Sequence, residues 1–355
     1  MPFRIRSAVL PLALAVLATG CPKGKSSGGS SVGTVLSVSP AALVGGATAA
    51  AGDPLPAQSL VSTNGTGHAD FKLNTKFTDC RLDVASSVQV SPPGGDLLAF
   101  KGGTTWCNTD TDIDFDVTVD SAQTSITVVD PVFGVTVLED RTIVAVAQGF
   151  VLVSTPGGEG SVLVGPNQES QVLEGQSPLP PVGFMPSDFE AQAIKDLSAS
   201  VPPPNFGPPE AGDSPTLMRI FGDLTLAAAF DEKQVQDEGT EDFSHDFVSF
   251  LGESWGLKPA LEPTSFAVAA RALADGFFDV VLSPETSTDL GSLQLFQDSG
   301  GRDWFLSFAA GDPTLEEALR DFVAAMLGSG DYGRIYQEDF GAQPNYEPFR
   351  SLIGL

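Results

Sequence analysis

The strongest constraint on the fold is an alternation, along residues 222–341, between apolar segments of strand length and segments with helical spacing. Residues 224–230 form an apolar run of strand length. Between residues 242 and 256, Phe243, Phe247, Phe250 and Leu251 follow the i, i+4, i+7, i+8 spacing of one buried helix face. Residues 257–264, 278–283 and 303–309 have the character of further strands, and residues 265–275 that of a helix. This rhythm predicts an α/β domain with a parallel sheet and flanking helices.

The preceding part of the chain, residues 32–174, has a different pattern. Short runs of Val, Thr, Phe and Leu alternate with clusters of Gly, Pro, Asn and Asp. Many short strands joined by turns predict an all-β domain. The candidate strands are residues 82–90, 125–129, 132–138, 142–146, 150–154 and 161–164.

Proline marks the boundary between these two regions. Residues 175–215 are rich in proline, which predicts a semi-rigid linker. Within the linker, residues 187–197 can form a short helix capped by Ser187 or Asp188. We therefore predict a multidomain chain, with an α/β domain at residues 216–341 and a tail at residues 342–355, of which residues 349–355 dock on that domain.

The first twenty residues have the character of an export signal. Arg4 and Arg6 precede an apolar run at residues 8–18, which is too short to span a membrane. The run ends in Leu17-Ala18-Thr19-Gly20-Cys21, which resembles the lipobox of bacterial lipoproteins, where the cysteine is acylated. A plain secretory signal is the alternative. Residues 21–31 then predict a flexible tether, and Pro22, where some lipoproteins carry an inner-membrane retention aspartate, favours the outer membrane.

Charge and cysteine content narrow the possible partners. A formal charge of −27 repels phosphate backbones and anionic bilayers, so nucleic-acid binding is excluded and contact with a membrane would depend on the lipid. Beyond Cys21, the chain has Cys80 and Cys107, and a pair in an exported protein most often forms a disulfide. Two cysteines with no histidine nearby make a poor metal site.

Four segments near the C-terminus occur in an order known from one family. They are Asp242-Phe243-Ser244-His245-Asp246-Phe247 with Trp255-Gly256, then residues 273–279, Gly311-Asp312-Pro313-Thr314-Leu315, and residues 330–341. Together they resemble lobe 1 of the family 3 solute-binding proteins, the periplasmic receptors for amino acids and similar solutes. The resemblance implies an α/β fold and binding of a small solute.

The N-terminal region resembles a second family. Gly52-Asp53-Pro54-Leu55 is followed by Val61-Ser62-Thr63, and residues 142–146 and 149–153 precede Gly165-Pro166-Asn167-Gln168. These segments are similar to the FecR-type domain, which implies a non-catalytic periplasmic β-domain. The membrane helix and cytoplasmic segment with which some members signal to a sigma factor are missing from the sequence, so that role is not expected.

Candidate ligand-binding residues follow the three parallel strands, because ligands of open α/β sheets bind beyond the carboxyl ends of the strands. They are Phe230, Asp231, Glu232, Thr264, Ser265, Phe266, Ser283, Glu285 and Thr286. The resemblance implies that Phe230 stacks on the solute and that the residues after the third strand offer hydroxyls and amides. Residues 284–288 lack the arginine with which the family binds an α-carboxylate. Residues 290–302 predict only a short crossing before the strand at residues 303–309. They are too few for the family's second lobe, so closure of two lobes over a solute is not expected.

No enzyme motif is apparent. His68 and His245 lie outside any nucleophile or metal motif, and a surface or partly packed position is expected for each. No sequence typical of a cofactor site was found. Asp110, Asp112, Asp114 and Asp116 alternate along a possible strand and could bind calcium, but a solvated strand face is the favoured interpretation.

We therefore expect a lipid-anchored envelope protein that binds a small solute or an envelope partner without catalysing a reaction. The alternative is a scaffolding lipoprotein in which both domains make only protein–protein contacts.

Overall fold

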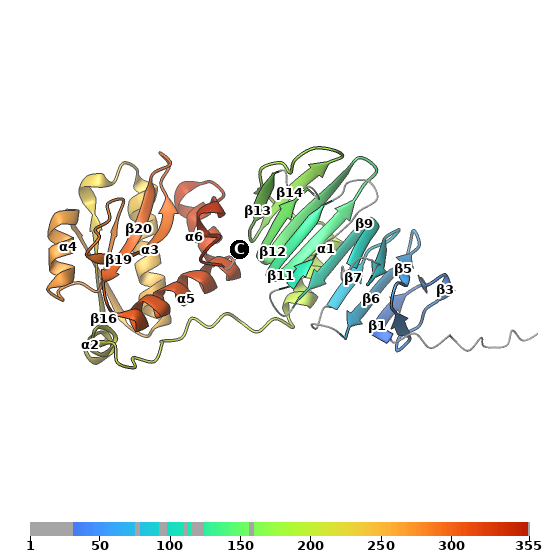
Figure 1. Ribbon diagram of the computed structural model, residues 1–355, viewed down its shortest axis with the longest axis horizontal. Coiled ribbons are helices and arrows are strands. Elements are labelled where there is room, and N and C mark those ends of the chain that lie inside the picture. Colours follow the sequence, from blue (N-terminus) through green and yellow to red (C-terminus); the bar gives the residue numbers. More distant parts are fainter. Residues whose placement is uncertain are drawn as a thin grey trace, which may run out of the picture.

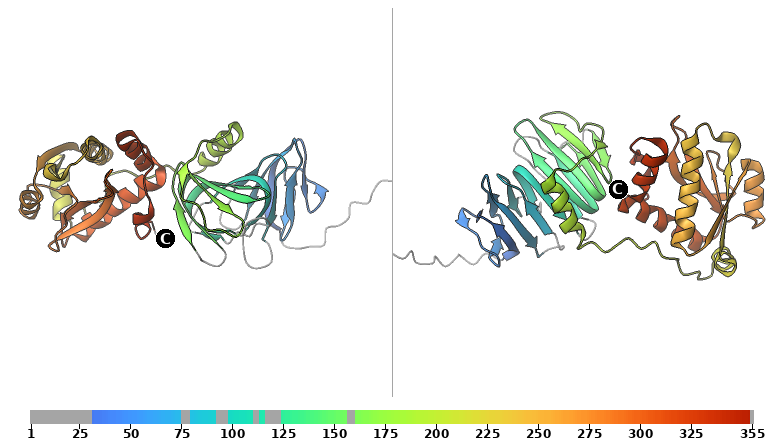
Figure 2. Two further views of the ribbon diagram at one scale, coloured as in Figure 1. Left: turned by 90° about the horizontal axis from the view of Figure 1, so that it is seen from above. Right: turned by 180° about the vertical axis from the view of Figure 1, so that it is seen from behind.

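The computed structural model describes residues 31–74, 79–91, 98–109, 113–115, 124–155 and 160–353, and the side chains of residues 113–115 and 129–131 are not described. The proposed signal and lipidation site at Cys21 lie outside these residues. Two domains lie side by side, and the chain end lies between them (Figure 1). We call residues 31–198 the β-domain and residues 215–353 the α/β-domain, and both views of Figure 2 show the same arrangement.

The β-domain is an antiparallel assembly of fifteen strands within the described residues. The strands are β1 (Ser31–Ser39), β2 (Ala42–Val44), β3 (Ala47–Thr48), β4 (Pro54–Pro56), β5 (Leu60–Thr63), β6 (His68–Leu73), β7 (Asp79–Leu82), β8 (Ser87–Val90), β9 (Leu98–Asn108), β10 (Ile113–Phe115), β11 (Ser125–Val137), β12 (Arg141–Ser154), β13 (Ser161–Val164), β14 (Gln168–Leu173) and β15 (Val182–Gly183). The main order is β15-β14-β12-β11-β9-β7-β6-β1-β4. Alternating burial, as in β6 and β7, encloses one apolar core. The all-β prediction for this region is confirmed.

Three strand predictions need correction. Of residues 82–90, predicted as one strand, Leu82 ends β7 and residues 87–90 form β8, and in the turn between them Ala85 has a positive φ of 52°. Residues 142–146 and 150–154, predicted as two strands, lie in the single strand β12. Residues 125–129 and 132–138, also predicted as two strands, lie in the single strand β11 except for Leu138. The register shifts between Val129 and Val132, so β11 continues through Pro131 by means of an irregularity.

Helix α1 (Asp188–Ser198), within the predicted linker, packs on the β-domain. Ser187 forms a capping box with Glu190, which fixes where the helix begins. Ala193 and Leu197 are buried against Trp106 on the outer face of the sheet. The linker proper therefore starts after α1, and Figure 1 shows it crossing to the other domain.

The α/β-domain has a five-stranded sheet between two helical layers. Its elements are α2 (Pro215–Asp223), β16 (Thr225–Asp231), the 3₁₀ turn η1 (Glu232–Gln234), α3 (Glu238–Ser254), β17 (Lys258–Thr264), α4 (Phe266–Ala274), β18 (Val280–Ser283), β19 (Leu290–Gln297), β20 (Asp303–Ala309), α5 (Pro313–Ser329), α6 (Asp331–Phe340) and η2 (Glu347–Phe349). Leu226, Ala228 and Phe230 point to the layer of α2, α3, α5 and α6, whereas Ala229 faces α4. This period-two alternation explains why an almost wholly apolar strand is buried on both faces.

The prediction of a parallel sheet was only partly correct. The order is β17-β16-β18-β20-β19, in which β16, β17 and β18 are parallel, and β20 is antiparallel to both β18 and β19. The predicted crossing at residues 290–302 contains β19. A turn of five residues follows it, too short for a parallel crossover, so β19 and β20 form a hairpin. Asp298 holds this turn by accepting hydrogen bonds from the Gly300 and Arg302 amides at 3.0 and 2.9 Å.

Candidate functional site

The parallel strands bring the predicted ligand residues to one edge of the α/β-sheet. In the register of β16 and β17, Asp231 lies opposite Thr264. In the register of β16 and β18, Phe230 lies opposite Leu282, and Ser283 ends the third strand. Three segments distant in sequence therefore end at this edge, which we call the carboxyl edge.

The aromatic residues of the carboxyl edge point into the protein. Phe230 is 3% exposed and belongs to the main core, where its ring lies 5.8 Å from that of the exposed His245. Phe266 is also buried, among the residues that α4 packs on the sheet. Neither ring offers an open face on which a solute could stack.

Polar groups of the carboxyl edge divide into buried and exposed sets. Ser283 is fully buried, and its Oγ accepts a hydrogen bond of 3.0 Å from the Glu285 amide. Glu285 is exposed and accepts a hydrogen bond of 3.3 Å from Gln234 Nε2. Glu232 and Thr286 are exposed, while Thr264 and Ser265 are half-buried.

Asp231 is the unusual member of this set. Its side chain is 2% exposed, and its Oδ1 is buried without a hydrogen-bond partner among the described residues. It precedes η1 but makes no capping hydrogen bond. A buried carboxylate normally has a hydrogen-bonding or charged partner, because leaving one unmatched costs several kcal/mol.

The sequence analysis missed one residue at this edge, Gln234 in η1. Its side-chain amide donates a hydrogen bond to Glu285, and its backbone carbonyl accepts a hydrogen bond of 2.5 Å from Arg302 Nη2. Gln234 thereby connects the carboxyl edge to the β19–β20 hairpin. Its place three residues after a parallel strand was the available signal.

The aspartate that ends residues 273–279 lies at the opposite, amino edge of the sheet. Asp279 is 1% exposed and forms an ion pair of 2.6 Å with Arg219 Nη2. It also accepts a hydrogen bond of 2.7 Å from the Ala227 amide. Burial raises the pKa of Asp279 despite these contacts. The residue therefore joins α2, β16 and β18 rather than contributing to the carboxyl edge.

A cluster of acids lies where α3 meets the end of α6. Burial, together with the charges of Asp246, Asp242 and Glu338, raises the pKa of Asp339 to about 6. As pH rises, Asp339 of the unfolded chain, with an ordinary pKa near 3.8, therefore loses its proton at a lower pH than Asp339 of the folded protein. The contribution of this proton to the stability of the fold is lost as pH rises from about 4 to 6, and none of it remains above pH 6.

We therefore expect Asp339→Asn to stabilise the protein at pH 7 by about 1 kcal/mol, a value reduced for solvent screening. The gain should vanish below about pH 4, where both states of the native protein are protonated. Urea unfolding at several pH values measures this. Asp321→Asn, an exposed acid on α5, is the control, and a gain that does not depend on pH would contradict the account.

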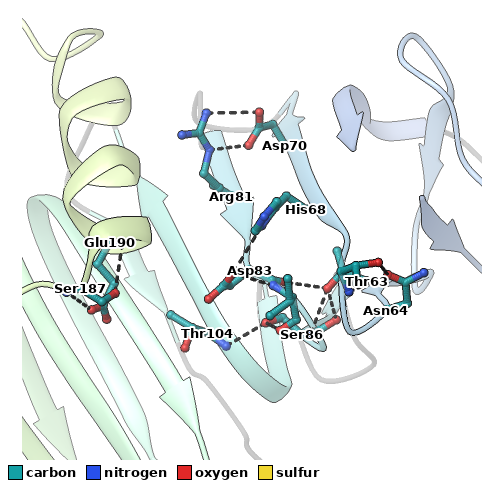
Figure 3. Close-up of polar contacts among 12 residues, drawn as sticks. Thr63, Asn64, His68, Asp70, Arg81, Asp83, Ser86, Thr104, Ser187 and Glu190 are labelled. Atoms are coloured by element: carbon teal, nitrogen blue, oxygen red, sulfur yellow. Dashed lines mark hydrogen bonds and ion pairs between the residues drawn. The ribbon is translucent and has the colours of Figure 1, made fainter. Parts of the chain in front are cut away.

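The β-domain brings together polar residues around its other histidine. His68 Nδ1 lies 3.3 Å from Asp83 Oδ1, and the imidazole stacks on Phe189 of α1 at 5.4 Å. Figure 3 shows this pair beside the Asp70–Arg81 ion pair and the Ser187–Glu190 capping box. Within the part of the chain that is described, His68 Nδ1 has no hydrogen-bond partner.

The predicted disulfide is present. Cys80 in β7 and Cys107 in β9 lie directly opposite each other and are bonded. Of the four aspartates considered for calcium, Asp110, Asp112 and Asp116 lie outside the described residues, and Asp114 lies in β10 with no description of its side chain. Among described residues, no group of three or more His, Cys, Asp or Glu could hold a metal, and no helix could cross a membrane.

Two cavities lie away from the carboxyl edge. One of about 260 Å³ lies between α1 and the sheet beside Trp106 and Glu169, and one of about 1000 Å³ lies between the domains. Burial, and after it the charge of Glu190, raises the pKa of Glu169. None of the nine predicted ligand residues lines either cavity.

Comparison with known proteins leaves the family open. No family model matches the chain, and no curated protein is significantly similar to it. A protein of Parabacteroides distasonis ATCC 8503 named "putative anti-sigma factor", with crystal structures at 1.65 and 2.50 Å, matches 50% of this chain and 80% of its own at 19% identity, with TM-scores of 0.31 and 0.30. An ancestral cationic amino acid solute-binding protein matches 35% of this chain and 99% of its own at 14% identity, with a TM-score of 0.30. At such TM-scores neither likeness supports an argument about function.

Proposed function

We propose that this chain is a lipid-anchored envelope protein that binds a small solute at the carboxyl edge of the α/β-domain without catalysing a reaction. Acylation of Cys21 supplies the anchor in this proposal, and mass spectrometry of the N-terminal peptide tests it. The observation that carries the binding function is the buried carboxylate of Asp231, whose Oδ1 has no hydrogen-bond partner among the described residues.

The position of Asp231 favours a ligand over a purely structural role. It lies where three parallel strands end, and in such sheets this edge is the usual place for ligands. No described side chain satisfies its Oδ1. In this proposal the edge opens locally to admit a solute, whose hydrogen-bond donor then removes the cost of leaving this buried atom unmatched.

Charge restricts the class of solute. Asp231, Glu232 and Glu285 are acidic, and the neighbouring Lys233 is exposed. Residues 284–288, which directly follow β18, contain no arginine to bind an α-carboxylate. The proposed solute therefore carries an amine or hydroxyl donor and no carboxylate at this position.

The test is a thermal-shift screen of the full chain against small amines, amides, amino acids and divalent cations. A solute at a hundred times its dissociation constant should add about 2.7 kcal/mol of stability. We expect Asp231→Asn to weaken a bound amine at least about tenfold, because hydrogen bonds to charged groups contribute about 1.5–3 kcal/mol.

Asp223→Asn is the matched control, since Asp223 is an exposed acid at the opposite edge of the same sheet. An amine should raise the melting temperature of the Asp223→Asn variant as much as that of the native protein. If the folded protein responds to no amine, or if both variants respond alike, solute binding at this edge is wrong, and the scaffolding alternative becomes the better one.

A further inference from the structure

The turn between β5 and β6 contains the single Asn-Gly pair of the sequence, Asn64-Gly65. The Gly67 amide donates a hydrogen bond of 3.2 Å to the Asn64 carbonyl, which closes a β-turn over Gly65 and Thr66. Figure 3 shows Asn64 beside Thr63, which ends β5. Asn64, Gly65 and Thr66 are all exposed, so water reaches both the Asn64 side chain and the Gly65 amide.

The side-chain carbonyl of Asn64 is oriented by two hydrogen-bond donors. Its Oδ1 accepts a hydrogen bond of 3.0 Å from the Thr66 amide and one of 3.2 Å from Thr66 Oγ1. Asparagine commonly bonds in this way to the backbone two residues further on. Donors aimed at a carbonyl oxygen stabilise the negative charge that develops there when a nucleophile attacks the carbon. The hydrogen bonds therefore make Asn64 Cγ a better electrophile.

The Gly65 amide nitrogen is the nucleophile within reach of this carbon. It donates no hydrogen bond to another described residue, so its deprotonation breaks no contact of the fold within the described ranges. Attack on Asn64 Cγ closes a small imide ring, and an intramolecular attack of this kind is favoured by proximity. Glycine also lacks the Cβ that would crowd the ring.

We propose that Asn64 is a site of spontaneous deamidation. The Gly65 nitrogen loses its proton to hydroxide and forms a bond to Asn64 Cγ, and the bond from Cγ to Nδ2 breaks. Nδ2 takes a proton from water and leaves as ammonia. A water molecule then opens the cyclic imide at one of its two carbonyls, which gives aspartate or isoaspartate. This reaction is independent of solute binding at the carboxyl edge.

The isoaspartate product should loosen the connection between two turns. The Asn64 carbonyl also accepts a hydrogen bond of 2.7 Å from the Ala85 amide, in the turn between β7 and β8. Beside it, Thr63 Oγ1 accepts a hydrogen bond of 2.9 Å from the Ser86 amide (Figure 3). In isoaspartate the main chain runs through the former side chain and is one carbon longer, and the former carbonyl becomes a carboxylate. The turn and its contact with Ala85 therefore cannot both keep their geometry.

The experiment is incubation of the full chain in buffers of rising pH at physiological temperature, followed by trypsin digestion and mass spectrometry. Trypsin releases residues 26–72 and residues 196–219, in which Asn64 and Asn205 respectively are the only asparagines. Fragmentation by electron transfer then distinguishes isoaspartate from aspartate. The rate at Asn64 should increase with pH, because the attack needs the deprotonated nitrogen.

Asn205 is the matched control within the same chain. It is also exposed, and its Oδ1 accepts a hydrogen bond of 3.0 Å from the Gly207 amide, but Phe206 follows it in place of a glycine. We expect Asn64 to react at least about tenfold faster than Asn205, which corresponds to a barrier lower by about 1.4 kcal/mol.

Gly65→Ala should slow the reaction of Asn64 at least about tenfold, because the added methyl group crowds the attack. The variant should fold, since φ of Gly65 lies outside the left-handed region and a Cβ there would meet no atom within 4 Å. Asn64→Gln, which would have to close a larger ring, is a second variant that should stay unmodified over the same period.

The melting temperature reports the effect on the turn. The aged native chain should melt at a lower temperature than the fresh chain, whereas both aged variants should melt as they did when fresh. The proposal is overturned if Asn64 reacts no faster than Asn205, if Gly65→Ala reacts as fast as the native chain, or if a native chain that is mostly isoaspartate melts as the fresh chain does.

Discussion

Phe243→Ala should destabilise the α/β-domain by about 4 kcal/mol, the range measured for removal of a fully buried phenylalanine. The ring is 0% exposed and lies 4.5 Å from that of Phe296 and 5.6 Å from that of Tyr332. It therefore joins α3 to β19 and α6, and its loss leaves a cavity that three elements cannot all close. Urea unfolding followed by tryptophan fluorescence measures the effect, because two of the three tryptophans, Trp255 and Trp304, lie in this core and Trp304 stacks on Phe296 at 5.5 Å.

Phe277→Ala provides the same chemical change at an exposed position. Phe277 is 73% exposed in the loop before β18, so its removal should cost less than about 0.5 kcal/mol. Equal costs for the two variants would show that the aromatic cluster does not carry the stability assigned to it.

The residues around Phe243 also show how much of this domain the sequence could predict. The spacing of Phe243, Phe247, Phe250 and Leu251 predicted the buried face of α3, and all of them are fully buried except Phe250, which is half-buried. Such spacing is local, and the helix forms whichever partners it finds. The identity of those partners, Phe296 in β19 and the tyrosines of α6, is a matter of tertiary packing that spacing does not encode.

The segment containing β19 was the main error in the fold. Residues 290–302 were expected to be a short crossing between two strands, too short for the lobe that the compared family carries there. In the structure Leu293, Leu295 and Phe296 are buried while Ser292 is exposed, a pattern broken by a register shift between Gln294 and Phe296. Strict alternation fails at such a shift, which explains why this strand was not recognised.

The candidate site was predicted in position but not in character. The rule for parallel strands placed Asp231, Thr264 and Ser283 correctly at one edge, since it depends only on strand direction. Whether Phe230 faces solvent or the core depends on which face of the sheet α3 covers, and that could not be decided from an apolar strand.

The interdomain cavity could not have been predicted at all. Asn108, Gln148 and Ser198 come from β9, β12 and α1, and nothing in the sequence relates them to Ala325 of α5. The tail brings these walls together by packing Tyr346 against Phe150 and by the hydrogen bonds of Glu347 and Pro344 to the β-domain. A cavity formed across a joint between domains leaves no motif in the sequence.

Reduction of the disulfide between Cys80 and Cys107 should cost the β-domain about 3.5 kcal/mol, because the bond closes a loop with a sequence separation of 27. Both cysteines are at most 1% exposed, so a reductant reaches them only when the domain opens, and samples must equilibrate in urea before measurement. The midpoint of urea unfolding of the native chain should fall on addition of dithiothreitol, whereas that of the double variant Cys80→Ala/Cys107→Ala should not move. Cys21→Ser should leave the reductant effect intact, since Cys21 has no part in the bond. A midpoint for the native chain that is insensitive to reductant after full equilibration would mean that β7 and β9 are held by their packing alone.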